Sequence, residues 1–288
     1  MARIALDPTP YNHTLSLLDF PDKAASLGYE YLQLTPNPDL GTHFHHPKLD
    51  RSMVTSLKKR ASDAGVSITS VQPVQRFGGP EEHQVRAAIY NAKAYIRLAA
   101  ELDAPIINTE FSGRPEREEE SENCFYRAMD ELLPVLETEG VTMNFDPHPD
   151  DFVENGLDAW RILRSLNSDR IGFVYVGAHA FHYVEPAASL LPTVGAGLKS
   201  VFISDSFDHR RSHSLRYISN PPGHTARVHQ HLKVGDGDVN FEELFGLLKA
   251  GGYLNDPDAL IVSNVFAEDE RADEVSRYQL ETIRSYLS

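Results

Sequence analysis

The amino-acid sequence predicts an α/β fold in which eight parallel strands, each followed by a helix, close into a single (β/α)8 barrel. Short apolar stretches alternate with longer stretches of helical periodicity along the whole chain. Eight such units are present, and eight parallel strands joined by crossover helices close naturally into a ring. A length of 288 residues without a linker or low-complexity segment suits one barrel domain covering residues 1–288.

Each element is predicted from its own pattern. The strands are expected at residues 3–8, 29–36, 66–73, 104–111, 141–149, 171–179, 198–206 and 259–266. The first helix is expected to end near Gly28, and the others to span 49–65, 80–102, 116–136, 157–166, 186–194, 241–250 and 269–287. Several of these helices close with a glycine, which accepts the left-handed backbone conformation common at helix ends.

The stretch 141–149 predicts a buried strand that ends in chemically active groups. Its alternate residues Val141, Met143 and Phe145 are apolar and should pack outward against helices, because side chains on a strand alternate between faces. Asp146 and His148 lie on the other face, and the prolines that follow them end the strand. The alternative interpretation is a turn capped by Asp and Pro.

Composition narrows the classes of function. Hydrophobic residues make up 41% and charged residues 24% of the chain, which is typical of a globular domain. A formal net charge of −15 argues against a nucleic-acid partner. We expect no membrane span, because no apolar run approaches the roughly 18 residues required. A cytoplasmic location is expected, since residues 1–7 lack a secretory signal and the single cysteine, Cys124, fits a reducing compartment. The composition leaves a homo-oligomer open.

In a barrel of this kind the active site lies at the carboxyl ends of the strands. Those ends carry polar side chains: Gln33, Gln72, Glu110, Asp146 with His148, His179 with His182, Asp205 and Asn264. The long segment 207–237 is predicted to be a lid or substrate-facing wall, and it adds Arg216, Arg227, His229 and His231. Carboxylates together with imidazoles suit Zn, Mn, Fe or Co. The alternative is a set of hydrogen-bonding groups that holds a polyol without metal.

Three segments carry a resemblance to a known superfamily. They are Asp-Pro-His-Pro-Asp-Asp-Phe at 146–152, Gly-Ala-His-Ala-Phe-His at 177–182 and Val-His-Gln-His-Leu-Lys-Val-Gly-Asp-Gly-Asp-Val-Asn-Phe at 228–241. The chain resembles the xylose-isomerase-like, endonuclease-IV-like TIM barrels over nearly its whole length. Within them it is most similar to the sugar phosphate isomerase/epimerase group. The segment 207–231 is similar to a branch associated with inositol catabolism.

The resemblance implies one divalent metal, held by glutamate, aspartate, histidine and glutamate on strands five to eight. This chain departs from that pattern, with Asp146, His179, Phe202 and Asn264 at the four positions. Two alternatives follow. Either a shifted set keeps the metal, with Glu110, Asp146, His179 and His231 as ligands, or the metal is lost and the chain binds a polyol or sugar phosphate as a noncatalytic or partner-dependent module.

The chemistry that the resemblance implies is removal of a proton next to a carbonyl, with a metal stabilising the enediolate. We therefore expect an enzyme similar to sugar or cyclitol (phosphate) isomerases and epimerases, metal-assisted and acting in inositol catabolism, with a dehydratase of a keto-cyclitol as the alternative. Glu110 or Asp146 is the expected base, and His182 or His229 the expected acid. Asn264 in place of a second acid argues against a symmetric two-base epimerase. The expected substrate-binding residues are Gln33, Gln72, His148, Arg216, Arg227 and Asn264.

Overall fold

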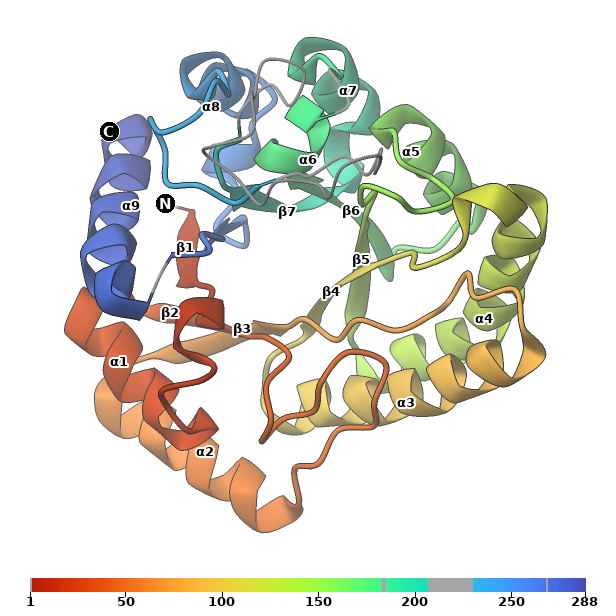
Figure 1. The fold of residues 1–288 in the computed structure, drawn as a ribbon, viewed down its shortest axis with the longest axis horizontal. Helices are drawn as coiled ribbons and strands as arrows, with labels where there is room; N and C mark the ends of the chain where they lie inside the picture. The colour runs from red at the N-terminus through yellow and green to blue at the C-terminus, as the bar shows by residue number, and fades with distance from the viewer. Residues whose placement is uncertain (1, 183–184, 207–229, 268) are drawn as a thin grey trace, which may run out of the picture.

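The computed structural model describes all residues except 1, 183–184, 207–229 and 268. Eight strands form a closed barrel in chain order, and every neighbouring pair is parallel, including β1 with β8. Helices surround this ring, as Figure 1 shows along a view into the barrel. The predicted single-domain (β/α)8 architecture is therefore confirmed.

The strands are β1 (Arg3–Leu6), β2 (Tyr31–Leu34), β3 (Ser67–Val71), β4 (Ile106–Glu110), β5 (Thr142–Asp146), β6 (Ile171–Val176), β7 (Leu198–Ile203) and β8 (Leu260–Ser263). The α-helices are α1 (Phe20–Leu27), α2 (Arg51–Ala64), α3 (Glu82–Glu101), α4 (Glu118–Glu139), α5 (Gly156–Ser165), α6 (Gly177–His182), α7 (Ala187–Val194), α8 (Phe241–Ala250) and α9 (Ala272–Leu287). Short 3-10 helices lie at Thr9–Tyr11, Leu17–Asp19, Pro115–Arg117, Gly195–Gly197, Tyr253–Asn255 and Asp269–Arg271.

One predicted boundary is wrong in a way that matters for the site. The sixth strand was expected to run to residue 179, but β6 ends at Val176 and α6 begins at Gly177. Val176 pairs with Phe202, and no later residue of this stretch takes part in the sheet. His179 consequently lies in the first turn of a helix and not at the tip of a strand.

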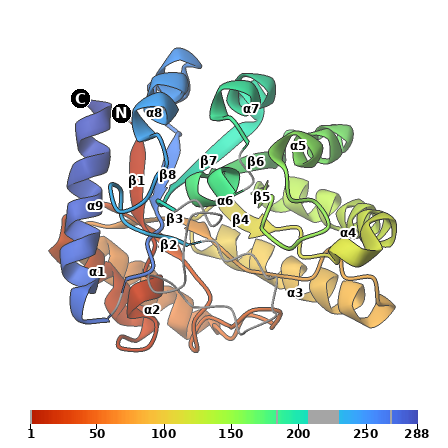
Figure 2. The same cartoon turned by 45° about the horizontal axis from the view of Figure 1, so that its top comes forward.

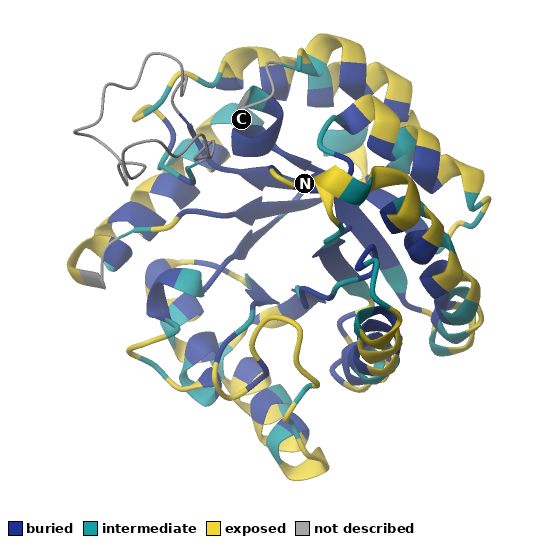
Figure 3. Ribbon diagram, turned by 45° about the vertical axis from the view of Figure 1, so that its right-hand side comes forward, coloured by how far each residue is buried: buried dark blue, intermediate teal, exposed yellow. Residues whose placement is uncertain are grey.

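The faces of β5 follow the predicted alternation. Phe145 packs against Phe77, Phe111 and Phe125, with ring centroids 5.1–5.8 Å apart, in the core between the barrel and its helices. The inward-facing Asn144 instead donates to Asn108 Oδ1 at 3.1 Å. Figure 3 shows the same division at the scale of the molecule, with buried strands inside and helices that are exposed only on their outer faces.

The barrel interior contains a polar layer and an apolar cluster. In the polar layer, Ser70 and Asn108 donate to Gln33 Oε1 at 2.8 and 2.9 Å, and Ser200 donates to Asn108 Oδ1 at 2.9 Å. The apolar cluster comprises Ala5, Val174, Val176, Phe202, Leu260 and Val262. These two groups show which residues of the strands point inward. The side chains at the mouth of the barrel follow the same alternation between inward and outward faces.

The two ends of the chain meet on one side of the barrel. Figures 1 and 2 both place the C-terminal helix α9 beside α1 and close to the start of β1. Lys23 of α1 binds Asp273 of α9 at 3.1 Å. This contact helps to hold the closing helix against the first one. Within the described residues, no helix is long and apolar enough to cross a membrane.

Candidate active site at the mouth of the barrel

Five polar side chains face the mouth because each lies two residues beyond an inward-facing residue of its strand. Asp7 follows Ala5, Gln72 follows Ser70, Glu110 follows Asn108, Asp146 follows Asn144, and Asn264 follows Val262. They come from β1, β3, β4, β5 and β8 and converge at the carboxyl end of the ring. This end is where barrel enzymes place their chemistry.

A cavity of about 450 Å³ opens at this mouth. Asp7, Gln72, Glu110, Asn264 and Phe266 line it from the strand ends. The loops after β1 and β2 add neutral polar groups, among them Thr9, Asn12, Thr35, Asn37 and Thr42. The volume is sufficient for a small molecule. Two carboxyl groups, the imidazoles of His13 and His43, several amides and hydroxyls, and the ring of Phe266 together suit a ligand with many hydroxyl groups.

A continuous run of hydrogen bonds crosses the barrel beside this cavity. His179 Nδ1 lies 2.9 Å from Asp146 Oδ1, and His179 Nε2 lies 3.1 Å from His231 Nε2. His231 Nδ1 in turn contacts Asn264 Oδ1, and Asn264 Nδ2 donates to Asp7 Oδ2 at 2.5 Å. The run joins β5 to β1 through α6, the segment that carries His231, and the residue after β8. All five of its residues are buried.

The directions of these bonds determine where protons lie. Asn264 uses its NH2 group on Asp7, so its oxygen accepts from His231 Nδ1–H. Burial lowers the pKa of His231 to about 4, which leaves the ring neutral, so Nε2 accepts from His179. Burial also raises the pKa of Asp146 to about 7, against the opposing charge of His148. The carboxyl group of Asp146 therefore keeps its proton to a higher pH than an exposed aspartate does.

Glu110 and His148 are further neighbours of Asp146 at this end of the barrel. Glu110 is paired in register with Asp146 across β4 and β5. The ring of His148 packs edge-on against His179, with centroids 4.8 Å apart. Burial alone would lower the pKa of His148, but the charges of Glu110 and Asp146 raise it above its usual value. This shift favours the protonated, positively charged form of the ring.

The segment that carries His231 is attached through Asp205, directly after β7. Asp205 Oδ2 accepts from Gly235 N and Gly237 N at 2.9 Å, and Oδ1 accepts from Val239 N at 3.0 Å. Backbone bonds also join Asp205 to Leu232 in both directions. A Cβ atom at Gly237 would lie 2.4 Å from Asp205 Oδ1, so only glycine allows this close approach. Asp205 is thus a structural anchor that positions His231.

The structure does not bring every predicted site residue to the cavity. Gln33 lies beneath it, because its Nε2 donates to Gln72 Oε1 at 2.8 Å and its Oε1 accepts from the inner polar layer. Gln33 therefore supports the wall of the cavity and does not line it. His182 ends α6, but its side chain lies outside the described part of the structure. Arg216, Arg227 and His229, together with most of the predicted lid, fall in residues 207–229, also outside it.

Among the five residues that line the cavity from the strand ends, Asp7 and Phe266 were absent from the sequence-based prediction, as were the loop residues of the lining. Asp7 directly follows the first strand, β1. Phe266 is 53% exposed, lines the cavity, and stacks on His231 with ring centroids 4.3 Å apart. Asp7 could have been found by applying the strand-end rule to the first strand. No sequence signal distinguishes Phe266 from a core residue.

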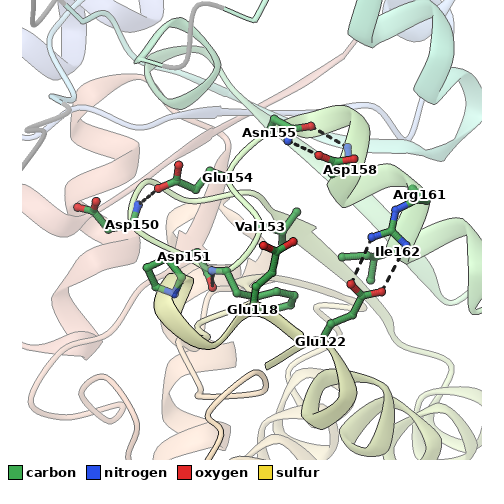
Figure 4. Close-up of a pocket in the computed structure, with 12 residues that line it drawn as sticks. Glu118, Glu122, Asp150, Asp151, Val153, Glu154, Asn155, Asp158, Arg161 and Ile162 are labelled. Atoms are coloured by element: carbon green, nitrogen blue, oxygen red, sulfur yellow. Dashed lines mark hydrogen bonds and ion pairs between the residues drawn. The ribbon is translucent and has the colours of Figure 1, made fainter. Parts of the chain in front are cut away.

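A second cavity, of about 520 Å³, lies outside the barrel between α4, α5 and the loop after β5. Figure 4 shows that carboxylates line much of it. Several of them contact their own surroundings: Glu154 accepts from Asp150 N at 2.9 Å, and Glu122 binds Arg161 at 3.3 Å. Because this cavity lies away from the strand-end groups, the mouth of the barrel is the better candidate.

Comparison with known proteins places this site in a family. Residues 21–286 match the model of the xylose isomerase-like TIM barrel. The chain belongs to this family. Among the curated proteins none matches the sequence. The xylose isomerase-like family is thus identified by its family model, and solved structures support the fold.

Three solved structures illustrate this likeness. A D-psicose 3-epimerase with D-tagatose from Clostridium cellulolyticum H10 is 14% identical, with a TM-score of 0.77 and 100% of both chains covered. The IolI protein with a bound zinc atom is 18% identical, with a TM-score of 0.75, covering 100% of this chain and 98% of that one. The probable 3-DHS dehydratase AsbF from Bacillus anthracis is 11% identical, with a TM-score of 0.69 and 99% of both chains covered.

The residues of this chain do not match the four-strand metal site that its family implies. The inward-facing residues near the ends of β6 and β7 are Val176 and Phe202, which pack in the apolar cluster inside the barrel. Within the described residues, no three His, Cys, Asp or Glu side chains are placed to hold a metal ion. The predicted ligand set of Glu110, Asp146, His179 and His231 is thus not assembled as a metal centre there. Among the side chains that the structure describes, His179 Nε2 and His231 Nε2 face each other at 3.1 Å, whereas zinc sites use three or four protein ligands.

Proposed function

We propose that this protein is a sugar or cyclitol isomerase or epimerase that removes a proton next to a carbonyl group, with Glu110 as the base. The observation that carries the proposal is the position of Glu110. Of the two expected bases, Glu110 and Asp146, it is the one that lines the cavity. Asp146, the other expected base, directs Oδ1 toward His179 instead.

The surroundings of Glu110 supply what such a step needs. Removing the proton leaves an electron pair that moves into an enediolate, whose oxygen becomes negative and requires donors. Gln72 can supply one, because its Oε1 accepts from Gln33 and its NH2 group remains to donate to a ligand. The raised pKa of His148 favours a positive charge on its ring, and this charge would stabilise the negative oxygen through space. Phe266 offers an apolar face to the carbon-bound hydrogens of a sugar.

The structural relatives motivate the choice of substrates. Because a D-psicose 3-epimerase has the same fold, D-fructose, D-psicose and D-tagatose are suitable probes. A keto-inositol tests the role in inositol catabolism that the sequence analysis expects. Each probe is incubated in D2O, and incorporation of deuterium next to the carbonyl is followed by NMR.

We expect wild-type protein to exchange at least one probe, and Glu110→Gln to slow the exchange of at least one of these probes by about a hundredfold or more, as loss of a general base does. Glu116→Gln, an exposed acid outside the mouth, is the matched control and should retain wild-type exchange. Exchange at wild-type rate with every probe in Glu110→Gln would show that another group is the base. Absence of exchange with every probe would contradict the proposed reaction itself.

Dehydration of a keto-cyclitol is the second candidate, since elimination of water next to a carbonyl also begins with proton removal. The solved structure of a probable dehydratase with this fold supports this second candidate. Mass spectrometry of the keto-inositol reaction separates the two candidates, because only dehydration lowers the product mass by one water.

A further inference from the structure

We propose that Asp7 is a second catalytic carboxylate, acting on the face of the substrate opposite to Glu110, so that the site inverts the configuration of a carbon next to a carbonyl. This rests on the proposed function, and it reverses one expectation from the sequence. In the sequence analysis, Asn264 in place of a second acid argued against a symmetric two-base epimerase. The structure instead places an acid from β1 directly beside Asn264.

The first support is position. Asp7 and Glu110 both line the same 450 Å³ cavity. Asp7 follows β1 and Glu110 ends β4, and three steps around a ring of eight separate these strands. The two carboxyl groups therefore enter the cavity from well-separated sides. A flat enediolate bound between them would present one face to each, which is the arrangement that inversion requires.

The second support is the way that Asp7 is held. Its Oδ2 accepts from Asn264 Nδ2 at 2.5 Å, and its Oδ1 accepts from Thr9 N at 2.9 Å. A carboxyl group has about four lone-pair positions, so these two bonds, together with a hydrogen bond from the Thr9 side chain, orient the group and leave a position for a proton or a substrate. Because His231 binds the oxygen of Asn264, the amide cannot turn away from Asp7 without losing a second bond. Asn264 is thus a positioning residue for Asp7.

The third support is the proton balance. In one direction, ionised Glu110 takes the carbon-bound hydrogen as a proton, the C–H electrons form the carbon–carbon double bond of the enediolate, and the carbonyl oxygen becomes negative. Protonated Asp7 then gives its proton to the opposite face, and the carbonyl re-forms. The pair needs one proton in total, and the reverse reaction exchanges the roles. Burial raises the pKa of Asp7, which favours its protonated form.

The test uses the C3 epimers D-fructose and D-psicose as probes in D2O, and it measures exchange and inversion separately. We expect Asp7→Asn to lower inversion by about a hundredfold or more while one of the two epimers still exchanges its hydrogen through Glu110. Glu110→Gln should show the reciprocal behaviour, with exchange of the other epimer only. A purely structural role for Asp7 would not separate these two readouts.

Other outcomes are equally informative. Inversion at wild-type rate in folded Asp7→Asn, or equal loss of exchange for both epimers, would overturn the assignment. If Asp7→Asn does not fold, Asp7→Glu replaces it, since this change keeps both acceptor oxygens but displaces them. It should slow inversion more than exchange, and equal slowing of the two would also overturn the assignment. If the wild type exchanges neither epimer, the proposed function fails for these ketoses and the role of Asp7 fails with it. Exchange without inversion in the wild type would overturn only the role of Asp7.

Discussion

Burial moves the pKa values of Asp146 and His231 in opposite directions, although both belong to one run of hydrogen bonds. For Asp146, the pKa in the folded protein is about 7, above the usual 3.8 of an aspartate. The folded state thus holds this proton more tightly than the unfolded state does, and stability from this group is lost as the pH rises from about 4 to 7. His231 has a folded pKa of about 4, below the usual 6.5, so its contribution increases over much of the same range.

The two contributions oppose each other in the wild type, and a substitution separates them. We expect Asp146→Asn to become more stable relative to the wild type as the pH rises from 4.5 to 7.5. The gain is on the order of 4 kcal/mol at most, at about 1.36 kcal/mol per pKa unit. Urea unfolding at the two pH values measures it. Asp130→Asn on the exposed face of α4 controls for the change from carboxylate to amide. A stability difference that does not change with pH would show that Asp146 is already ionised at low pH in the folded protein.

At the scale of elements, the barrel mouth depends on a single carboxylate that holds the segment after residue 229. Asp205 accepts four backbone N–H groups, from Ser206, Gly235, Gly237 and Val239, at 2.8–3.0 Å. We expect Asp205→Ala to lower the free energy of unfolding by roughly 3 kcal/mol or more, because it leaves several of these donors without an acceptor.

Urea unfolding measures this loss, and Asp236→Ala is the matched control in the same segment. Asp236 forms an exposed ion pair with Lys233 at 2.6 Å, a type of contact that contributes about 0–1 kcal/mol. Since His231 lies in the anchored segment, Asp205→Ala should also slow deuterium exchange of the ketose probes. Equal stability of the two variants would mean that Asp205 does not anchor the segment.

At the scale of the molecule, charge favours an uncharged ligand. The chain carries a formal net charge of −15, and the cavity lining includes Asp7, Glu110, His13 and His43 but no lysine or arginine among the described residues. A phosphate group in that cavity would meet the negative charge that the Asp7–Glu110 pair carries when it holds one proton. We therefore expect kcat/KM for D-fructose to exceed that for D-fructose 6-phosphate by about tenfold or more, equivalent to about 1.4 kcal/mol.

Steady-state kinetics with both compounds measures this preference, and added salt should reduce it because ions screen charge repulsion. The opposite preference would indicate that a cation from residues 207–229 joins the site. Arg216→Ala and Arg227→Ala would then show which of the two predicted substrate-binding arginines is responsible.

Much of the fold follows from local patterns in the sequence. Eight alternating units predict the barrel, and the period of two along each strand predicts that Phe145 packs outward while Asn144 and Asp146 face inward. The strand-end positions of Glu110, Asp146 and Asn264 follow from the same rule, because a strand's side-chain directions depend only on the residues of that strand. Their roles in catalysis, substrate binding or metal binding stay predictions.

Tertiary structure alone decides which of these groups meet. Asp7 and Asn264 are 257 residues apart and become partners only because β1 closes the ring beside β8. His179 and His231 are 52 residues apart, and their contact depends on the end of β6 at Val176 and on the anchor at Asp205. A local pattern carries no information about such pairs, because closure of the barrel, and not periodicity along the chain, sets the distances between strand ends.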